Sequence, residues 1–168
     1  MNAAVDSIKA KHNIDKVVLV GQSGGATTVG ALLTLGRTDV SCAVGGSGGY
    51  AVFELAEVKR WKAGSRSQRG MDSTGWSDSY DVIEYVREIK PDPRRRIFIV
   101  GDPKDRNTVF DLQKKFAERV RDAGHDVHLV EVRGTGPENH NVIDPALKLS
   151  SLCSAGVPTE DLIQRIQN

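Results

Sequence analysis

One short segment has the residue types and spacing for nucleophilic catalysis. Gly21-Gln22-Ser23-Gly24-Gly25 contains the pattern G-x-S-x-G, between an apolar run at 17–20 and a helix-like apolar run at 26–35. In that context a tight strand-to-helix turn lifts the serine hydroxyl clear of the sheet. The amide of Gly24 would then face the serine oxygen and favour negative charge there. The alternative is a phosphate-binding turn, which lacks support because neither Gly-Lys-Ser/Thr nor G-x-G-x-x-G is present.

A serine hydroxyl needs a general base, and the base needs a carboxylate to orient it. In a parallel sheet such groups gather at the carboxyl ends of the strands. Asp102 and Asp105 follow the apolar run at 97–100, and His140 follows the run at 127–132. The sequence therefore offers one nucleophile, one base and two candidate acids for the same edge of a sheet.

The elements that must position these groups alternate between apolar runs and helical patterns, as in an α/β fold with a parallel sheet. We predict one domain over 1–168 with about four strands, helices on both faces of the sheet, and a cap-like insert at about 49–90. The expected strands are 17–20, 40–44, 97–100 and 127–132. The expected helices are 3–12, 26–35, 81–89, about 109–123, 143–154 and one beginning at 158–159.

Composition narrows the class of partner. The 168 residues are 39% hydrophobic and 27% charged with a net charge of +1, which is typical of a globular domain and gives no reason to expect nucleic acid or an anionic membrane. Only 5% are aromatic, so a base-stacking platform is not expected. No apolar run approaches the ~18 residues of a membrane span. The N-terminus lacks the apolar core of a signal peptide.

The sequence gives no pattern for a metal or a cofactor. His, Cys, Asp and Glu show no zinc-like spacing, so we expect neither a metal site nor a cofactor. Cys42 and Cys153 are too few and too far apart for a disulfide framework, and we expect two reduced cysteines packed as small hydrophobes.

From Ala3 to about residue 155 the chain resembles the C-terminal part of an α/β-hydrolase, closest to the prolyl oligopeptidase and dienelactone hydrolase branches. The stretches that carry the resemblance are 17–25, 96–108 and 116–127 leading into the His140 loop. The resemblance implies that Ser23 is the nucleophile, His140 the base and Asp105 the acid. It also implies an oxyanion and substrate-binding role for Gly24 and Gln22.

The chain departs from a complete α/β-hydrolase, which has about eight strands and a loop before the nucleophile strand that gives a second oxyanion amide. We therefore expect an esterase-type serine hydrolase acting on a small ester, or on a short peptide as a sub-case. The alternative is a non-catalytic remnant or assembly module. The edge of strand 17–20 should bind a second copy or a partner chain, because exposed edges are normally covered or paired.

Overall fold

The computed structural model describes residues 2–62, 71–72 and 76–167, without the side chains of 60–62. Part of the predicted cap-like insert at about 49–90, including Arg66, Arg69 and the side chain of Trp61, therefore lies outside the described residues. The helices are α1 (Asn2–His12), α2 (Gly24–Thr34), α3 (Val52–Lys62), η1 (Val82–Glu88), α4 (Phe110–Asp122), η2 (Pro137–Asn139), α5 (Ile143–Ser154) and α6 (Thr159–Gln167). The strands are β1 (Val17–Gln22), β2 (Val40–Gly46), β3 (Arg96–Gly101) and β4 (Val127–Glu131).

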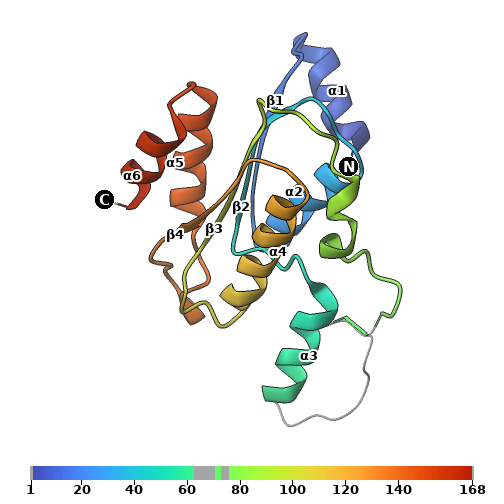
Figure 1. Cartoon of the computed structure of the whole chain (residues 1–168), viewed down its shortest axis with the longest axis vertical. Coiled ribbons are helices and arrows are strands. Elements are labelled where there is room, and N and C mark those ends of the chain that lie inside the picture. The colour runs from blue at the N-terminus through green and yellow to red at the C-terminus, as the bar shows by residue number, and fades with distance from the viewer. Residues whose placement is uncertain (1, 63–70, 73–75, 168) are drawn as a thin grey trace.

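The four strands form one parallel sheet in the order β1-β2-β3-β4 (Figure 1). Each connection between neighbours crosses over a helix, which a parallel pair requires. The predicted α/β fold class, with about four parallel strands and helices on both faces, is confirmed. The helix expected over 143–154 has those bounds in the structure, whereas α3 lies in a stretch for which no helix was predicted.

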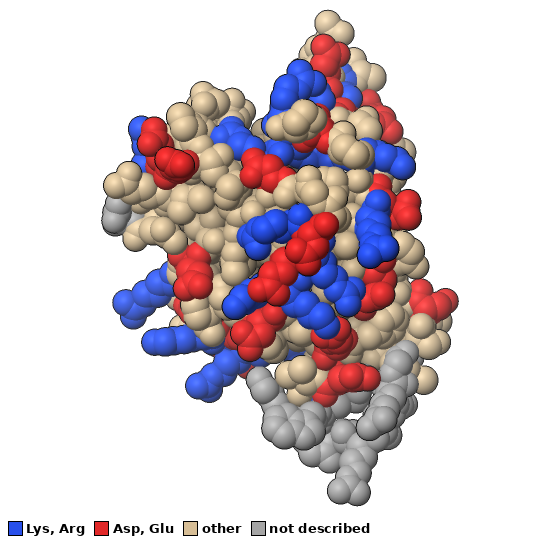
Figure 2. All heavy atoms as spheres, viewed as in Figure 1, with Lys and Arg blue, Asp and Glu red and all other residues tan. Residues whose placement is uncertain are grey.

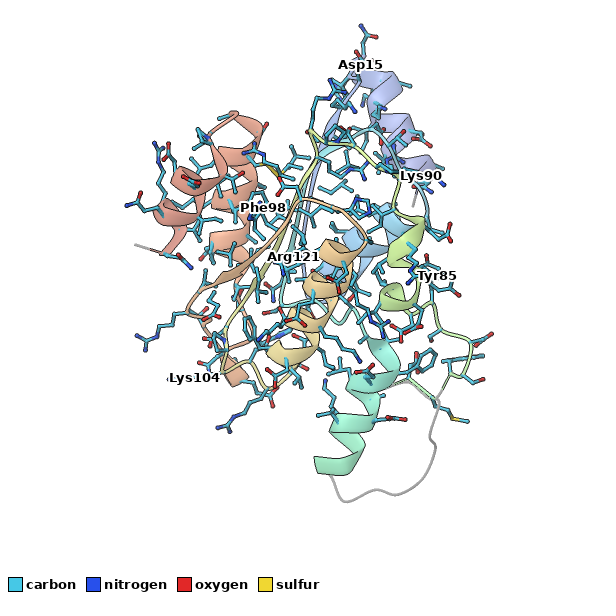
Figure 3. The ribbon with its side chains drawn as sticks, viewed as in Figure 1. Asp15, Tyr85, Lys90, Phe98, Lys104 and Arg121 are labelled. Atoms are coloured by element: carbon cyan, nitrogen blue, oxygen red, sulfur yellow. A yellow bond between two sulfur atoms is a disulfide. The ribbon has the colours of Figure 1, made fainter. Side chains whose placement is uncertain are left out.

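Two apolar clusters hold the helices on opposite faces of the sheet. In the first cluster α2, η1 and α4 pack against residues such as Ala43 and Ile99. In the second, α5 and α6 pack against Cys42, Val44 and Phe98, and Figure 3 shows Phe98 between the sheet and α5. Alternate side chains of each strand enter opposite clusters, as the period of two demands. The sheet is thus fixed from both sides, which gives its carboxyl edge a rigid base.

The strands share one direction, so their carboxyl ends lie at one edge of the molecule. In Figure 3, Asp15 precedes β1 at the upper end of the view and Lys104 follows β3 at the lower end. On the outer face of α4 acidic and basic side chains are interspersed (Figure 2). Two of these basic groups, Lys115 and Arg119, pair with acids of α3 and η1. No helix in the described part of the chain is long and apolar enough to cross a bilayer.

The expectation of two reduced cysteines is wrong in this structure. Cys42 of β2 and Cys153 of α5 form a disulfide, with Cα atoms 6.5 Å apart. The two residues are 111 positions apart in sequence, and α5 brings them together by packing its inner face on β2. A Cα separation in this range permits the bond. The disulfide ties the helix that follows the His140 loop to the middle of the sheet.

Candidate active site

Ser23 lies at a strained turn between β1 and α2. Its backbone has φ 56° and ψ −121°, an uncommon conformation for a residue with a side chain. Its N–H donates to the carbonyl of Gly46, 2.8 Å away, which anchors the turn to β2. A Cβ at Gly21 would lie 2.3 Å from the backbone of Gly25, so only glycine fits there. The turn predicted from G-x-S-x-G is therefore present.

The structure brings together three of the residues singled out in the sequence. The Nε2 atom of His140 is 2.9 Å from the Oγ of Ser23, and its Nδ1 atom is 3.0 Å from Oδ2 of Asp105. The side chain of Asp105 is fully buried and that of His140 is 17% exposed. With the proton on Nδ1, Nε2 is free to accept the serine proton. This arrangement is the one that activates a serine for attack.

Asp105 is held by more donors than His140 alone. Its Oδ1 accepts the backbone N–H of Asn107 at 2.8 Å and of Thr108 at 3.1 Å, and its Oδ2 accepts the hydroxyl of Thr108 at 2.9 Å. Burial acts to raise the pKa of Asp105, but hydrogen bonds from His140 and from these backbone amides outweigh it and hold the pKa below its usual value. The carboxyl group is therefore ionised and fixed in orientation at neutral pH.

Asp102, the other candidate acid, has different partners. Its Oδ1 accepts the N–H of Lys104 at 2.7 Å, and its Oδ2 accepts the N–H of Gly134 at 2.7 Å. A Cβ at Gly134 would lie 2.1 Å from the carbonyl oxygen of Asn139, so the chain passes very close to itself there. Asp102 thus joins the loop after β3 to the loop that carries His140, and Asp105 is the aspartate in contact with the imidazole.

Gln22 and Gly24, predicted as oxyanion or substrate-binding residues, flank Ser23. The Gln22 side chain donates from Nε2 to the carbonyl of His140 at 2.7 Å and accepts at Oε1 the N–H of Val142 at 3.1 Å. Both of its polar ends therefore hold the His140 segment against the nucleophile strand. Gly24 begins α2, where the first backbone amides have no carbonyl partner within the helix, so its N–H suits an oxyanion.

Backbone strain is concentrated at this end of the sheet. Non-glycine residues with positive φ in the described chain are Asn13, Ser23, Ser47, Val109, Glu138 and Asn139. All except Asn13 lie in the loops that carry or border Ser23, Asp105 and His140. Each such conformation costs on the order of 1–3 kcal/mol and persists where the surroundings impose it, most often at functional sites. The strain supports these loops as the functional region independently of the hydrogen bonds.

The insert at about 49–90, predicted to be cap-like, carries Trp76 and Tyr80 and is described only in part. Trp76 is 65% exposed, and Tyr80 stacks on Tyr85 and donates its hydroxyl to Oγ1 of Thr34 at 2.9 Å. Thr34 is the last residue of α2, whereas Ser23 precedes the first. At 1.5 Å per residue the two ends of this helix are about 16 Å apart. Tyr80 therefore lies away from Ser23.

Sequence reasoning missed several residues that hold the site. Ser47 follows β2 with positive φ, and its carbonyl oxygen lies 3.1 Å from Oγ1 of Thr108, the same atom to which Gln113 of α4 donates. For Gln113 a signal exists, because it lies three residues before Phe116 and seven before Val120 and so shares their buried face. For the main-chain role of Ser47 the sequence contains no signal.

Comparison with solved structures relates this fold to known hydrolases. The Pyrococcus furiosus esterase Pf2001 matches with a TM-score of 0.60 and 16% identity, over 96% of this chain and 58% of the esterase. The uncomplexed acylaminoacyl peptidase of Pyrococcus horikoshii matches with a TM-score of 0.60 and 13% identity, over 89% of this chain and 26% of the peptidase. The chain has the fold of these α/β-hydrolases. It spans less than two thirds of either protein, and no family model or curated protein matches its sequence.

Proposed function

We propose that this chain is a serine hydrolase that cleaves carboxylic esters through an acyl-enzyme on Ser23. The observation that supports this most strongly is the continuous series of hydrogen bonds from Ser23 through His140 to Asp105, at 2.9 and 3.0 Å. The likeness to an esterase and a peptidase agrees with it at the level of the fold. A closer relation to the prolyl oligopeptidase and dienelactone hydrolase branches is part of the same proposal.

In the first half of the reaction, Nε2 of His140 takes the hydroxyl proton as Oγ of Ser23 attacks the ester carbonyl carbon. The N–H of Gly24 donates to the oxyanion that forms, and Asp105 stabilises the imidazolium. The bond from carbon to the alcohol oxygen then breaks, and His140 returns its proton to the leaving alcohol. In the second half, His140 takes a proton from water as the water oxygen attacks the acyl carbon. The bond from that carbon to Oγ of Ser23 then breaks, and His140 returns its proton to Oγ, which releases the acid and restores Ser23.

The leaving group decides which substrates suit this site best. Gly24 is one oxyanion donor, and losing one of two donors typically costs ~10²–10³ in rate. Esters with activated leaving groups place less demand on the oxyanion hole, so short activated esters are the substrates of choice for assay. A peptide bond has a poorer leaving group, and hydrolysis of short peptides is therefore the second activity to measure.

A different function is favoured by one observation, the open edge of β1. The esterase and the peptidase of similar fold are longer chains. Here β1 pairs with β2 on one side, and the described residues place no strand on the other. A sheet edge of this kind binds another chain by strand addition. In that case the chain would be a non-catalytic assembly module that keeps the geometry of the site.

A serine-directed phosphonate probe tests the proposed function. We expect the folded protein to be labelled on Ser23 alone, because its hydroxyl is the one hydrogen-bonded to His140, while Ser47 and Ser150 are buried. Mass spectrometry of the labelled peptide identifies the site, and urea-unfolded protein is the control that should remain unlabelled. Labelling of another serine, or none in the folded protein, would exclude the assignment and favour the assembly module.

We further propose that the open edge of β1 binds a second copy or a partner chain. The N–H of Val17 donates to the residue before β2, and that of Ser23 donates to the last residue of β2. Because successive N–H groups of a strand point to alternate sides, the N–H of Val18 faces the open side. Proline lacks an N–H and is tolerated on edge strands. Val18→Pro should therefore remove association across this edge while keeping the β1–β2 pairing.

Light scattering over a range of concentrations checks this prediction. We expect the wild-type mass to rise with concentration and that of Val18→Pro to remain monomeric. Leu129→Pro is the matched control, because its N–H faces the outer edge of β4, and it should associate like the wild type. A wild type that stays monomeric at high concentration would rule out self-association.

A further inference from the structure

A fully buried glutamine lies behind the proposed acid. Gln113 of α4 is 0% exposed and is on the same face as Phe116 and Val120, which belong to the apolar cluster under the sheet. Its Oε1 atom has no hydrogen-bond partner among the described residues. A buried amide with an unpaired oxygen is costly, and such groups call for a reason. The contacts of the side-chain nitrogen explain why a glutamine lies here.

The nitrogen of this side chain contacts the group that holds Asp105. Nε2 of Gln113 donates to Oγ1 of Thr108 at 3.2 Å. Oγ1 of Thr108 lies 2.9 Å from Oδ2 of Asp105 and 3.1 Å from the carbonyl oxygen of Ser47. The threonine has one hydroxyl hydrogen for these two acceptors, and the ionised carboxylate is the stronger acceptor. Since Gln113 donates to the threonine oxygen, that hydrogen remains available to Asp105.

The orientation of the Gln113 amide matters for this arrangement. If Oε1 faced Thr108 instead, it would accept the hydroxyl hydrogen and compete with Asp105. In the structure Oε1 points toward Gly101, where a Cβ would lie only 2.6 Å from this oxygen. A glycine at the end of β3 therefore leaves room for the end of the Gln113 side chain.

We propose that Gln113 is a positioning residue that acts through Thr108 to fix the Asp105 carboxylate toward His140. The inference rests on the proposed function, in which Asp105 orients the general base. A hydrogen bond donated into a chain of hydrogen bonds polarises the next donor, so each member strengthens the one after it. Gln113 touches neither substrate nor Ser23, and its effect reaches the imidazole only through Thr108 and Asp105.

A purely structural role for Gln113 predicts that Gln113→Leu lowers the melting temperature and leaves kcat unchanged. A positioning role predicts the opposite pattern. Leucine has a similar size and would remove the unpaired oxygen from an apolar cluster that contains Phe116, so Gln113→Leu should leave the melting temperature unchanged or raise it. A positioning role predicts a lower kcat in the same variant. Stability and activity should therefore move apart.

A double-mutant cycle in the full chain tests the inference. We expect Gln113→Leu and Thr108→Val each to lower kcat for an activated ester by about 3- to 10-fold, the worth of one hydrogen bond, with KM unchanged. Because Gln113 acts through Thr108, adding Gln113→Leu to Thr108→Val should lower kcat no further. Val120→Ala is the control, since this buried α4 residue should lose stability and keep kcat.

Failure of this inference can be distinguished from failure of the proposed function. Additive effects, or an unchanged kcat in Gln113→Leu when Thr108→Val lowers it, would overturn the inference. If the wild type hydrolyses no ester, the proton NMR signal of His140 Nδ1 decides instead. A shift of that signal in Gln113→Leu and in Thr108→Val, but not in Val120→Ala, would support the relay, and an unmoved signal would overturn it.

Discussion

Ser23→Ala should remove nearly all ester hydrolysis, with kcat reduced by about 10⁴- to 10⁶-fold, as when the nucleophile of a serine protease triad is deleted. The reason is geometric, because the lost Oγ is the atom 2.9 Å from Nε2 of His140, and nothing else on the turn replaces it. Alanine tolerates the positive φ at position 23 no worse than serine does, so the fold should persist. Hydrolysis assays with an activated ester measure the loss of kcat, and urea unfolding measures whether the fold persists.

Ser41→Ala is the matched control for Ser23→Ala. Ser41 is also a serine of the sheet region, in β2. Its hydroxyl donates to the carbonyl of Val17, at the opposite end of β1 from Ser23. This variant should keep wild-type kcat. Substantial hydrolysis by Ser23→Ala, above that of the unfolded protein, would show that another group performs the reaction.

Much of the fold follows from local sequence because its signals are local. The apolar run Val17–Val20 specifies a strand buried on both faces, and the structure places it between the two apolar clusters. The stripe of Val109, Leu112, Phe116 and Val120 specifies one face of α4, with Gly124 after its end. For the same reason Ser23 could be assigned to a turn, since the glycine at 21 is demanded by a contact within the motif itself, with the backbone of Gly25.

The interactions that could not be predicted join segments that are distant in the chain. The disulfide of Cys42 and Cys153, the bridge from Gln22 to the His140 segment, and the contact of Thr108 with Ser47 depend on how the helices pack on the sheet. The helix α3 was missed for a different reason. Its apolar residues form no clear stripe, and it follows the glycine-rich end of β2, so neither periodicity nor a start signal marks it.

Asp105→Asn should lower kcat by up to about 10⁴-fold while the protein remains folded, as in the serine protease precedent. Asn keeps an oxygen for the N–H groups of Asn107 and Thr108, and it then turns its NH₂ group toward Nδ1 of His140. Nδ1 must then accept this hydrogen bond, so the imidazole proton moves to Nε2. Nε2 can therefore no longer take the proton of Ser23. The loss should appear in kcat at all pH values where the wild type is active.

The same variant has a signature in acid. Because the pKa of Asp105 is lowered in the folded protein, its ionised form stabilises the fold above the pKa of the unfolded chain, and this stabilisation is lost as pH falls through the folded-state value. Asp105→Asn lacks this contribution at every pH. Urea unfolding should therefore show a gap in stability between wild type and variant at pH 7 that narrows as the buffer is acidified below about pH 4.

Asp102→Asn separates the two aspartates that the sequence offered. Asp102 accepts the N–H of Lys104 on one oxygen and that of Gly134 on the other, so an amide NH₂ would oppose one of these donors. We expect a lower melting temperature, because the loop after β3 and the loop that carries His140 are then held together less strongly. The loss of kcat should be much smaller than in Asp105→Asn. If Asp102→Asn abolished turnover while Asp105→Asn kept it, Asp102 would be the residue that orients His140, and the contact seen at 3.0 Å would be structural.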